Sequence, residues 1–302
     1  MLILQYTLGL DIGTSAVKAL LMDQNGEIVA ENSEEYPLAT PNPGWAEQKP
    51  EDWWQASQKV IKDLIKENEI DNSQIEAISF SGQMHSSVFL DEEMKVIRPA
   101  ILWCDTRTSA ECDEIYERVG GVKKLAELVS NPALEGFTAP KILWLRNHEP
   151  ENFKKVAKVL LPKDYIRYKL SGELGMDLSD AAGTLLCDVK AEAWSTELMD
   201  KLELDPSIMP PVLKSIDVVG PVTAEAAEKT GLATSTKIVA GGADNACGSV
   251  GSGIIKAGRV MASLGSSGVV VAQTDQPEAD PEGRIHLFNH AVPDSYYMMG
   301  VV

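Results

Sequence analysis

The glycine and hydroxyl turn at residues 13–15 is the strongest chemical signal in the sequence. Apolar residues alternate with small or polar ones through the segment LGLDIGTSAVK, residues 8–18, which predicts a β-hairpin with Gly13, Thr14 and Ser15 at its tip. Small residues let backbone N–H groups approach phosphate oxygens, and the hydroxyls add donors. Asp11 lies at the mouth of the tip, where a carboxylate could hold a hydrated Mg²⁺. A tight hairpin with an exposed acid is the alternative interpretation.

A second turn of the same kind strengthens the phosphate interpretation. Residues 260–271, VMASLGSSGVVV, again predict a strand, a glycine and serine turn, and a strand. Two such hairpins far apart in one chain suggest two halves that close on one polyphosphate. Neither turn has the Walker pattern, and neither has the glycine spacing of a Rossmann fingerprint.

Asp244 is the candidate base. Gly241, Gly242 and Asp244 follow an apolar strand and open a predicted helix. An acid that complements the helix dipole would explain Asp244 without any function. The functional interpretation adds the two glycines, which leave space above the carboxylate for a ligand. We expect the helix N-terminus to keep Asp244 ionised and weakly basic, which phosphoryl transfer tolerates because its transition state is loose.

Polar residues also follow two other predicted strands. Residues 82–85, GQMH, end a buried strand, where open sheets usually carry ligand loops, so ligand contact and a structural histidine are equal alternatives for His85. Trp103 could pack on a sugar face, with Asp105 and Arg107 hydrogen-bonded to hydroxyls. Taken alone, these three residues fit a core tryptophan beside an exposed ion pair better.

The elements that must position these residues alternate between strands and helices. Antiparallel strands are expected at 7–12, 16–22 and 28–36, and a helix is expected from about Pro50. Further strands are expected from Ile75, at 86–91 and at 96–103. A helical stretch is expected over about 107–171, broken at residues 120–121, 131–132 and 150, as an insertion on the sheet scaffold. A strand, a glycine turn and a helix are expected from Thr236.

Length and charge exclude several classes. The 302 residues suggest two domains, which we place at 1–250 and 251–302. With 27 basic and 45 acidic residues, the net charge of −18 predicts a protein that binds neither nucleic acid nor anionic membranes. The four cysteines fit neither a zinc site nor a disulfide framework. Because no signal peptide or membrane span is recognisable, we expect a cytoplasmic protein.

Nine segments together resemble the xylulose-phosphorylating members of the FGGY family of carbohydrate kinases. The resemblance implies an α/β, ribonuclease H-like fold shared with actin and hexokinase, in two domains around a cleft, with the second domain incomplete here. It also implies ATP-dependent phosphorylation of D-xylulose at O5, with ATP and Mg²⁺ as cofactors. The segments are LGLDIGTSAVK, GWAEQKPEDWW, SGQMH, RPAILWCDTRT, FTAPKILWLRNHEPENF, LLPKDYIRYKLSGE, SDAAGT, GGADNA and SLGSSGV.

The resemblance assigns roles to individual residues. Asp244 matches the general base, and Asp11 matches the acid near Mg²⁺. The positions matched to sugar contacts are Gln83, Met84, His85, Trp103, Asp105 and Asn245. The positions matched to the two phosphate hairpins are Gly13, Thr14, Ser15 and Lys18, and Gly265 and Ser266.

Three departures from the family pattern matter. Ser266 stands where the family usually has threonine, which keeps the hydroxyl, and Cys104 stands where asparagine is common. The chain ends at Val302, whereas family members continue through a second domain with a glycine-rich adenosine-binding motif. We therefore expect these 302 residues to bind sugar but to show little kinase activity alone.

Other functions remain open from the sequence. Kinases for ribulose, glycerol or gluconate are the alternatives within the class, and the run Gln83-Met84-His85 favours xylulose. A non-catalytic nucleotide-binding protein of the same superfamily is the alternative outside it, against which Asp244 in GGADNA counts. A homodimer is also open.

Overall fold

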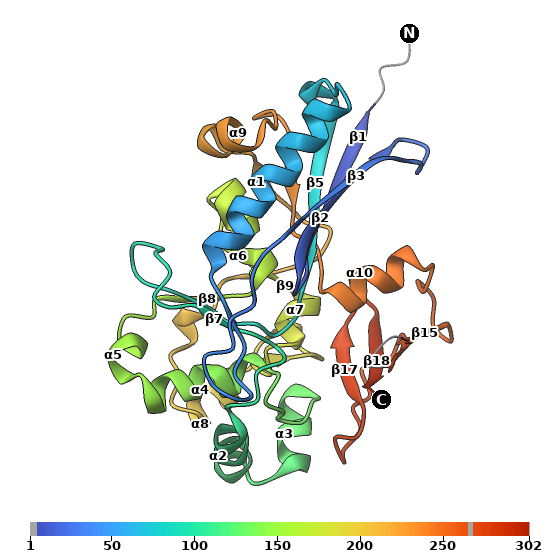
Figure 1. Ribbon diagram of the computed structural model, residues 1–302. Coiled ribbons are helices and arrows are strands. Elements are labelled where there is room, and N and C mark those ends of the chain that lie inside the picture. The colour runs from blue at the N-terminus through green and yellow to red at the C-terminus, as the bar shows by residue number, and fades with distance from the viewer. Residues whose placement is uncertain (1–4, 265–267, 302) are drawn as a thin grey trace.

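A six-stranded sheet forms the centre of the computed structural model, which describes residues 5–264 and 268–301. Its strand order is β13-β14-β5-β1-β2-β3 (Figure 1). The strands are β1 (Tyr6–Ile12), β2 (Ala16–Asp23), β3 (Ile28–Glu35), β5 (Ile75–Gly82), β13 (Val218–Pro221) and β14 (Lys237–Val239). The first three match the expected strands to within a residue at each end.

The sheet mixes antiparallel and parallel pairs. The hairpins β1–β2 and β2–β3 are antiparallel, whereas β5 runs parallel to both β1 and β14. The predicted turn between β2 and β3 is present, because Gly26 has a φ of 85° and its N–H donates to the Asp23 carbonyl over 3.1 Å. Leu8, Leu10 and Ile12 alternate with more exposed neighbours on β1 and point into the core.

Helices cover one face of this sheet. In Figure 1, α1 (Pro50–Glu67), α6 (Pro162–Ser171) and α9 (Ala224–Thr230) lie together on that face. Helix α1 begins at the predicted Pro50, with Glu51 and Asp52 in its first turn, where acids stabilise a helix. The buried face of α1 carries Trp53, Trp54, Ala56, Ser57, Val60, Ile61 and Leu64.

The stretch of about 107–171 is largely helical, as expected. Its longer helices are α2 (Ser109–Val119), α3 (Val122–Val129) and α4 (Thr138–His148). The predicted break at residues 120–121 is confirmed, since both glycines have positive φ. The shorter helices are α5 (Pro150–Phe153), α7 (Leu178–Ala182) and α8 (Thr196–Lys201), with 3₁₀ turns at Asn72–Gln74 and Pro206–Ile208.

Four short strand pairs stabilise the region between β5 and β13, and one of them, β4 with β7, joins it to the segment before α1. They are β4 (Glu47–Gln48) with β7 (Ala100–Ile101), β6 (Val88–Leu90) with β8 (Lys158–Leu160), β9 (Met176–Asp177) with β12 (Val212–Leu213), and β10 (Cys187–Asp188) with β11 (Ala193–Trp194). The expected strands at 86–91 and 96–103 are therefore shorter than predicted, and β8 interrupts a stretch expected to be helical.

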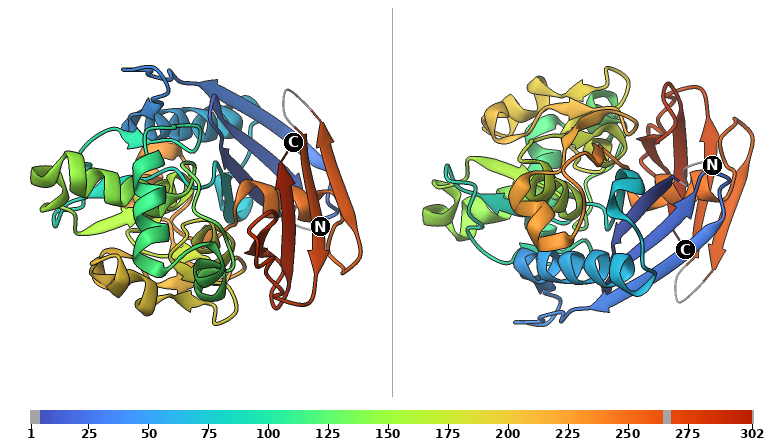
Figure 2. Two further views of the ribbon diagram at one scale, coloured as in Figure 1. Left: turned by 90° about the horizontal axis from the view of Figure 1, so that it is seen from below. Right: turned by 90° about the horizontal axis from the view of Figure 1, so that it is seen from above.

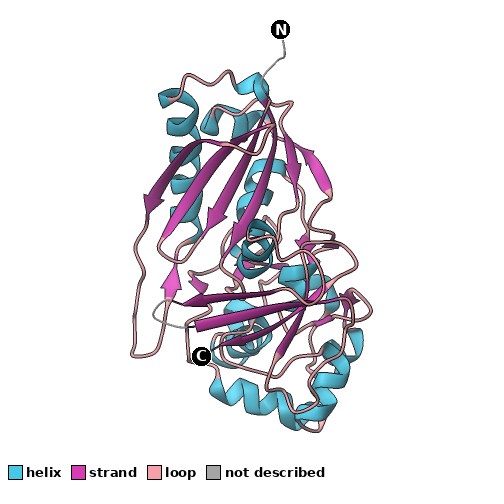
Figure 3. Ribbon diagram, turned by 90° about the vertical axis from the view of Figure 1, so that its right-hand side faces the viewer, coloured by secondary structure: helices cyan, strands magenta, loops and turns pink. Residues whose placement is uncertain are grey.

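A second sheet closes one side of the molecule. Its four antiparallel strands are β15 (Val260–Leu264), β16 (Gly268–Thr274), β18 (Tyr296–Val301) and β17 (His286–Asn289), in that order. Helix α10 (Asp244–Gly251) precedes this sheet along the chain, and the two sheets stand next to each other in Figure 3. Seen from below in Figure 2, the second sheet lies on one side of the molecule, next to the central sheet. The expected strands of the second hairpin are present, but Gly265 and Ser266 lie outside the described residues.

Two further expectations can be compared with the structure. All four cysteines are free, as expected. Within the described residues, no helix has both the length and the apolar composition that crossing a bilayer requires.

Candidate active site

A cavity of about 390 Å³ brings together most of the predicted sugar-contact residues. Its walls come from segments that are far apart in the sequence, including the loop after β5, the segment before α4, the start of α10 and the second sheet. The lining residues are Met84, His85, Trp103, Cys104, Asp105, Thr106, Leu134, Glu135, Gly136, Phe137, Asp244, Asn245, Val269, His286 and Met299.

Asp244 opens α10 at the floor of this cavity. Its Oδ1 atom accepts hydrogen bonds from the Asn245 backbone N–H over 2.7 Å and from the Asn245 side-chain amide over 2.9 Å. Oδ2 has no protein donor among the described residues. Burial raises the pKa of the Asp244 carboxyl to about 6, although the Asn245 bonds oppose the shift, and the negative charge of Asp11 adds to it. The expected low basicity is therefore wrong, because burial outweighs the helix N-terminus.

The glycines before Asp244 fix the direction in which α10 leaves the sheet. Gly241 has a φ of 80°, and a Cβ atom there would lie 2.3 Å from the Phe80 carbonyl oxygen. The N–H of Gly242 donates to that same carbonyl over 2.9 Å. The glycines thus allow close contact with β5, in addition to the space for a ligand that the sequence suggested.

His85 is held in one orientation and one tautomer. Its backbone has a φ of 66°, an uncommon value for a residue with a side chain, and its carbonyl accepts from Thr138 Oγ1 and Lys141 Nζ. Nδ1 lies 2.6 Å from the Gly183 carbonyl oxygen and must donate to it, so Nε2 is left as an acceptor. Burial, with a contribution from the Lys141 charge, lowers the pKa of His85 to about 3. The ring is therefore neutral.

The residue types alone favoured a core Trp103 beside an exposed ion pair, but in the structure Trp103 is partly exposed and Asp105 is buried. The Trp103 side chain is 47% exposed, and its indole N–H donates to Thr14 Oγ1 over 2.9 Å. The Asp105 carboxylate is buried and accepts from Arg107 and from the Ala46 N–H over 2.6 Å. The Arg107 guanidinium stacks on Trp45 at 3.7 Å. Asp105 therefore lines the cavity with a carboxylate that already has protein partners.

Gln83 connects the loop before the cavity to the first hairpin and does not line the cavity. Its amide nitrogen lies 3.2 Å from Gln48 Oε1 and 3.4 Å from the Gly13 carbonyl, and its amide oxygen accepts from Thr14 Oγ1. Gln48 in turn donates to the Thr14 carbonyl over 2.7 Å. Gln83 thus helps to fix the tip of the hairpin.

The tip of the first hairpin has free donors. Its carbonyls accept from side chains, including the Tyr36 hydroxyl at Gly13, whereas no described residue accepts from the N–H groups of Thr14 and Ser15. Asp11 and Lys18 lie directly opposite each other on β1 and β2, with Asp11 half-buried and Lys18 exposed. These free N–H groups and the nearby carboxylate fit a phosphate group and its hydrated cation.

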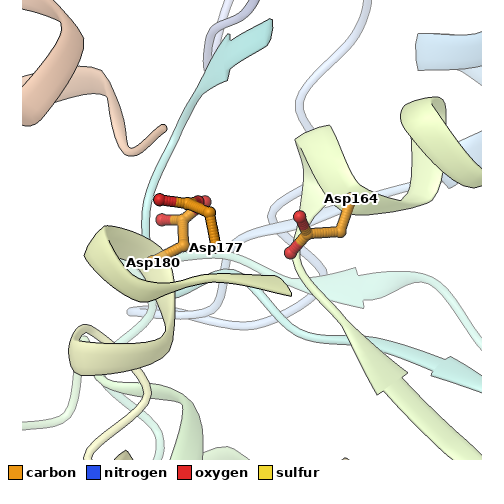
Figure 4. Close-up of side chains that lie close together, drawn as sticks. All are labelled: Asp164, Asp177 and Asp180. Atoms are coloured by element: carbon orange, nitrogen blue, oxygen red, sulfur yellow. The ribbon is translucent and has the colours of Figure 1, made fainter. Parts of the chain in front are cut away.

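A buried charge network lies behind α10. The carboxylates of Asp164, Asp177 and Asp180, drawn in Figure 4, lie close enough to bind a metal ion. The ammonium nitrogen of Lys163 lies 2.7, 2.7 and 2.9 Å from them, so this side chain already fills the centre of the group. Arg167 adds a second cation 3.1 Å from Asp164, and all five side chains are fully buried. Burial raises the pKa of Asp180 well above its ordinary value.

This network connects to the candidate base through Ser179. The Ser179 hydroxyl lies 2.5 Å from Asp177 Oδ2, and its oxygen accepts the N–H of Ala243 over 2.9 Å. Ala243 immediately precedes Asp244. Sequence reasoning missed the network because lysine and aspartate are usually exposed, and their spacing alone does not reveal burial.

Known proteins resemble this chain over nearly its whole length. A family model described as the FGGY family of carbohydrate kinases, N-terminal domain, matches residues 6–251. The xylulose kinase of Bacillus subtilis is 45% identical over 298 residues, which cover 99% of this chain and 59% of the relative. The xylulose kinase of Lactococcus lactis is 47% identical over 297 residues, which cover 98% of this chain and 58% of the relative.

A solved structure gives the same picture. The crystal structure of a "xyloylose kinase" from Brucella ovis superposes with a TM-score of 0.94 at 39% identity, covering 99% of this chain and 61% of that one. The chain thus spans about 60% of the length of the proteins that it matches.

Proposed function

The chain belongs to the FGGY family of carbohydrate kinases, and from this premise we propose that the protein phosphorylates D-xylulose at O5 with ATP. The observation that carries the proposal is Asp244, a carboxylate with one free oxygen on the floor of a cavity large enough for a pentose. The choice of sugar is supported by the curated relatives, which are named xylulose kinases.

Asp244 is the proposed general base. Its free Oδ2 takes the proton from the attacking hydroxyl, while Asn245 holds Oδ1 through two hydrogen bonds and so fixes the plane of the carboxylate. A pKa of about 6 leaves most of the side chain ionised at neutral pH and makes it a stronger base than an exposed aspartate.

The sugar is held by groups around this base. His85 Nε2 accepts from a sugar hydroxyl, and Met84 packs beside Asn245, whose amide nitrogen lies 3.7 Å from the methionine sulfur. Trp103 offers a half-exposed ring face to the sugar and is tied by its indole to the hairpin at Thr14. We retain Asp105 as a wall of the site and Gln83 as a support of the hairpin.

The phosphates of ATP are proposed to lie on the two hairpins. Thr14 and Ser15 supply backbone donors, and Gly13, whose N–H is bonded to the Ala16 carbonyl, lets the phosphate approach the turn. Lys18 lies beside them, and Gly265 and Ser266 supply the second hairpin. Asp11 would hold Mg²⁺ through water, and the bound ion would neutralise charge on the transferring phosphate.

The domain division and the cellular location are part of the proposal. We assign residues 1–250 to the sugar-binding domain and 251–302 to the nucleotide domain, a division supported by the end of α10 at Gly251. Four unpaired cysteines support a cytoplasmic location.

A coupled kinase assay on the complete gene product tests the substrate. D-xylulose should have a higher kcat/KM than ribulose, glycerol or gluconate. Faster turnover of one of these three would replace the sugar assignment and keep the kinase class. Absence of sugar-dependent ATP consumption with all four would reject the function. The chain of 302 residues, assayed in parallel, should bind sugar with little turnover.

A further inference from the structure

His286 lies on the wall of the cavity that the second sheet provides. It begins β17, and its ring lies between two phenylalanines, 5.5 Å from Phe137 and 5.6 Å from Phe288. The Phe288 ring is stacked on it with an interplanar angle of 19°. Phe137 also contacts His85 at 4.6 Å, so the two imidazoles flank one aromatic ring. This packing gives His286 a fixed orientation.

The two ring nitrogens of His286 have no partner among the described residues. Nδ1 is fully buried without a hydrogen bond, whereas Nε2 is not fully buried. Burial lowers the pKa of His286, so the ring is neutral and carries one hydrogen. An orphaned buried N–H is rarer than an orphaned buried acceptor, which places the hydrogen on Nε2.

We propose that His286 is a sugar-contacting residue whose Nε2–H donates a hydrogen bond to an oxygen of the bound ketose. This inference rests on the proposed function and goes beyond it, because it makes the second sheet part of the sugar site. His85 and His286 then have complementary roles, since Nε2 of His85 accepts and Nε2 of His286 donates. A ketose offers hydroxyls that do both and a carbonyl that only accepts. The pair would therefore discriminate between sugars by the position of the carbonyl and the hydroxyls.

Calorimetric titration of D-xylulose into the 302-residue chain tests the contact. His286→Phe keeps the aromatic stack and removes both nitrogens, so we expect affinity to fall on the order of 10-fold without a fall in Tm. His286→Gln keeps an N–H donor and should recover part of the loss. His290→Phe is the matched control, because His290 follows the same strand and does not line the cavity. It should leave affinity unchanged.

Analogues of D-xylulose that each lack one oxygen identify the partner atom. The native chain should bind one analogue more weakly than D-xylulose. For that analogue, His286→Phe should have the same affinity as the native chain. ¹⁵N NMR of the native chain should show His286 as the Nε2–H tautomer, with its Nε2 resonance shifted on sugar addition.

The outcomes separate this inference from the proposed function. Unchanged D-xylulose affinity in a folded His286→Phe variant, or an Nδ1–H tautomer, would overturn the inference and leave the function intact. Binding of ribulose, glycerol or gluconate in place of D-xylulose would reject the sugar assignment, and the same variants titrated with that ligand would still decide the role of His286. Failure of the native chain to bind any of the four would reject both.

Discussion

At the scale of single residues, burial of Asp244 raises the pKa of its carboxyl and makes its ionised form unfavourable for stability. We expect Asp244→Asn in the complete gene product to lower kcat by about 10²-fold or more, the usual scale for loss of a general base. For the native gene product, the proposed kcat/KM should fall below pH 6, because the raised pKa of about 6 leaves the proposed base protonated there. Steady-state kinetics over pH 5–8 measures both effects. Near-normal kcat at saturating sugar would contradict the base assignment.

The same shift predicts a stability change with a defined sign. A carboxyl whose folded pKa is raised binds its proton more tightly in the folded state, so ionisation between about pH 4 and 6 destabilises the fold. Asp244→Asn should therefore be at least as stable as the native chain at pH 7, and its advantage should vanish toward pH 4. Urea unfolding at both pH values checks that lost activity is not lost structure.

His85 is the second residue with a sharp expectation. His85→Ala should weaken D-xylulose binding by roughly 1–3 kcal/mol, because it removes a buried acceptor at the sugar. The positive φ of 66° makes alanine strained at position 85. Asparagine adopts positive φ more readily, so His85→Asn separates the effect of backbone strain from the loss of the imidazole. Calorimetry measures the affinity, with His148→Ala as a control outside the cavity. Native affinity in both folded variants at position 85 would return His85 to a structural role.

At the scale of elements, the start of α10 depends on one glycine. Gly241→Ala should destabilise the fold by more than about 2 kcal/mol, since its φ of 80° is unfavourable and its Cβ would meet the Phe80 carbonyl at 2.3 Å. Gly248→Ala within α10 is the matched control, because a Cβ there meets nothing within 4 Å. It should be neutral or stabilising by up to about 1 kcal/mol. Equal free energies of unfolding for the two variants would refute the argument.

The contact between α6 and α7 depends on the buried charges. Lys163→Met should cost about 3–5 kcal/mol of unfolding free energy, because three buried carboxylates lose their central cation. Lys62→Met, on an exposed face of α1, should stay within about 0.5 kcal/mol of the native chain. Denaturant melts measure both. A loss below 1 kcal/mol at Lys163 would show that the network contributes little.

The elements also show what the sequence could and could not predict. Strands β1, β2 and β3 and the start of α1 follow from alternation, an Asn-Gly turn and a proline at the first helical position. The fold class expected from the family motifs is confirmed by the matched family and structures. The residues predicted from the motifs around Asp244 and His85 also line one cavity.

Other features depend on tertiary contacts that local patterns do not encode. The short strands β7 and β8 exist only because they pair with distant partners, Glu47–Gln48 and Val88–Leu90. The raised pKa of Asp244 comes from burial, which overrode a helix-end argument. His286 and Phe137 carry no local signal of ligand contact, and they reach the cavity only when the second sheet meets the helical segment.

At the scale of the whole molecule, the cavity gathers residues from Met84 to Met299, so a bound sugar should stabilise the entire chain. A ligand at 100 times its Kd adds about 2.7 kcal/mol, which corresponds to a rise in Tm of several degrees. Thermal melts of the 302-residue chain with D-xylulose should show this rise, and hydrogen exchange should slow in both β5 and β17. His85→Ala should reduce the shift. An unchanged Tm at saturating sugar would argue against a common site.

The buried network around Lys163 also constrains how this sequence can change over evolutionary time. Loss of the lysine alone leaves carboxylates without compensation, and loss of one aspartate leaves N–H donors of Lys163 or Arg167 buried without an acceptor. Well-packed apolar residues could replace the whole group at once, but each single step toward that state passes through a destabilised intermediate. Positions 163, 164, 167, 177 and 180 should therefore be inherited as one unit, either all retained or exchanged together in separate lineages of descent.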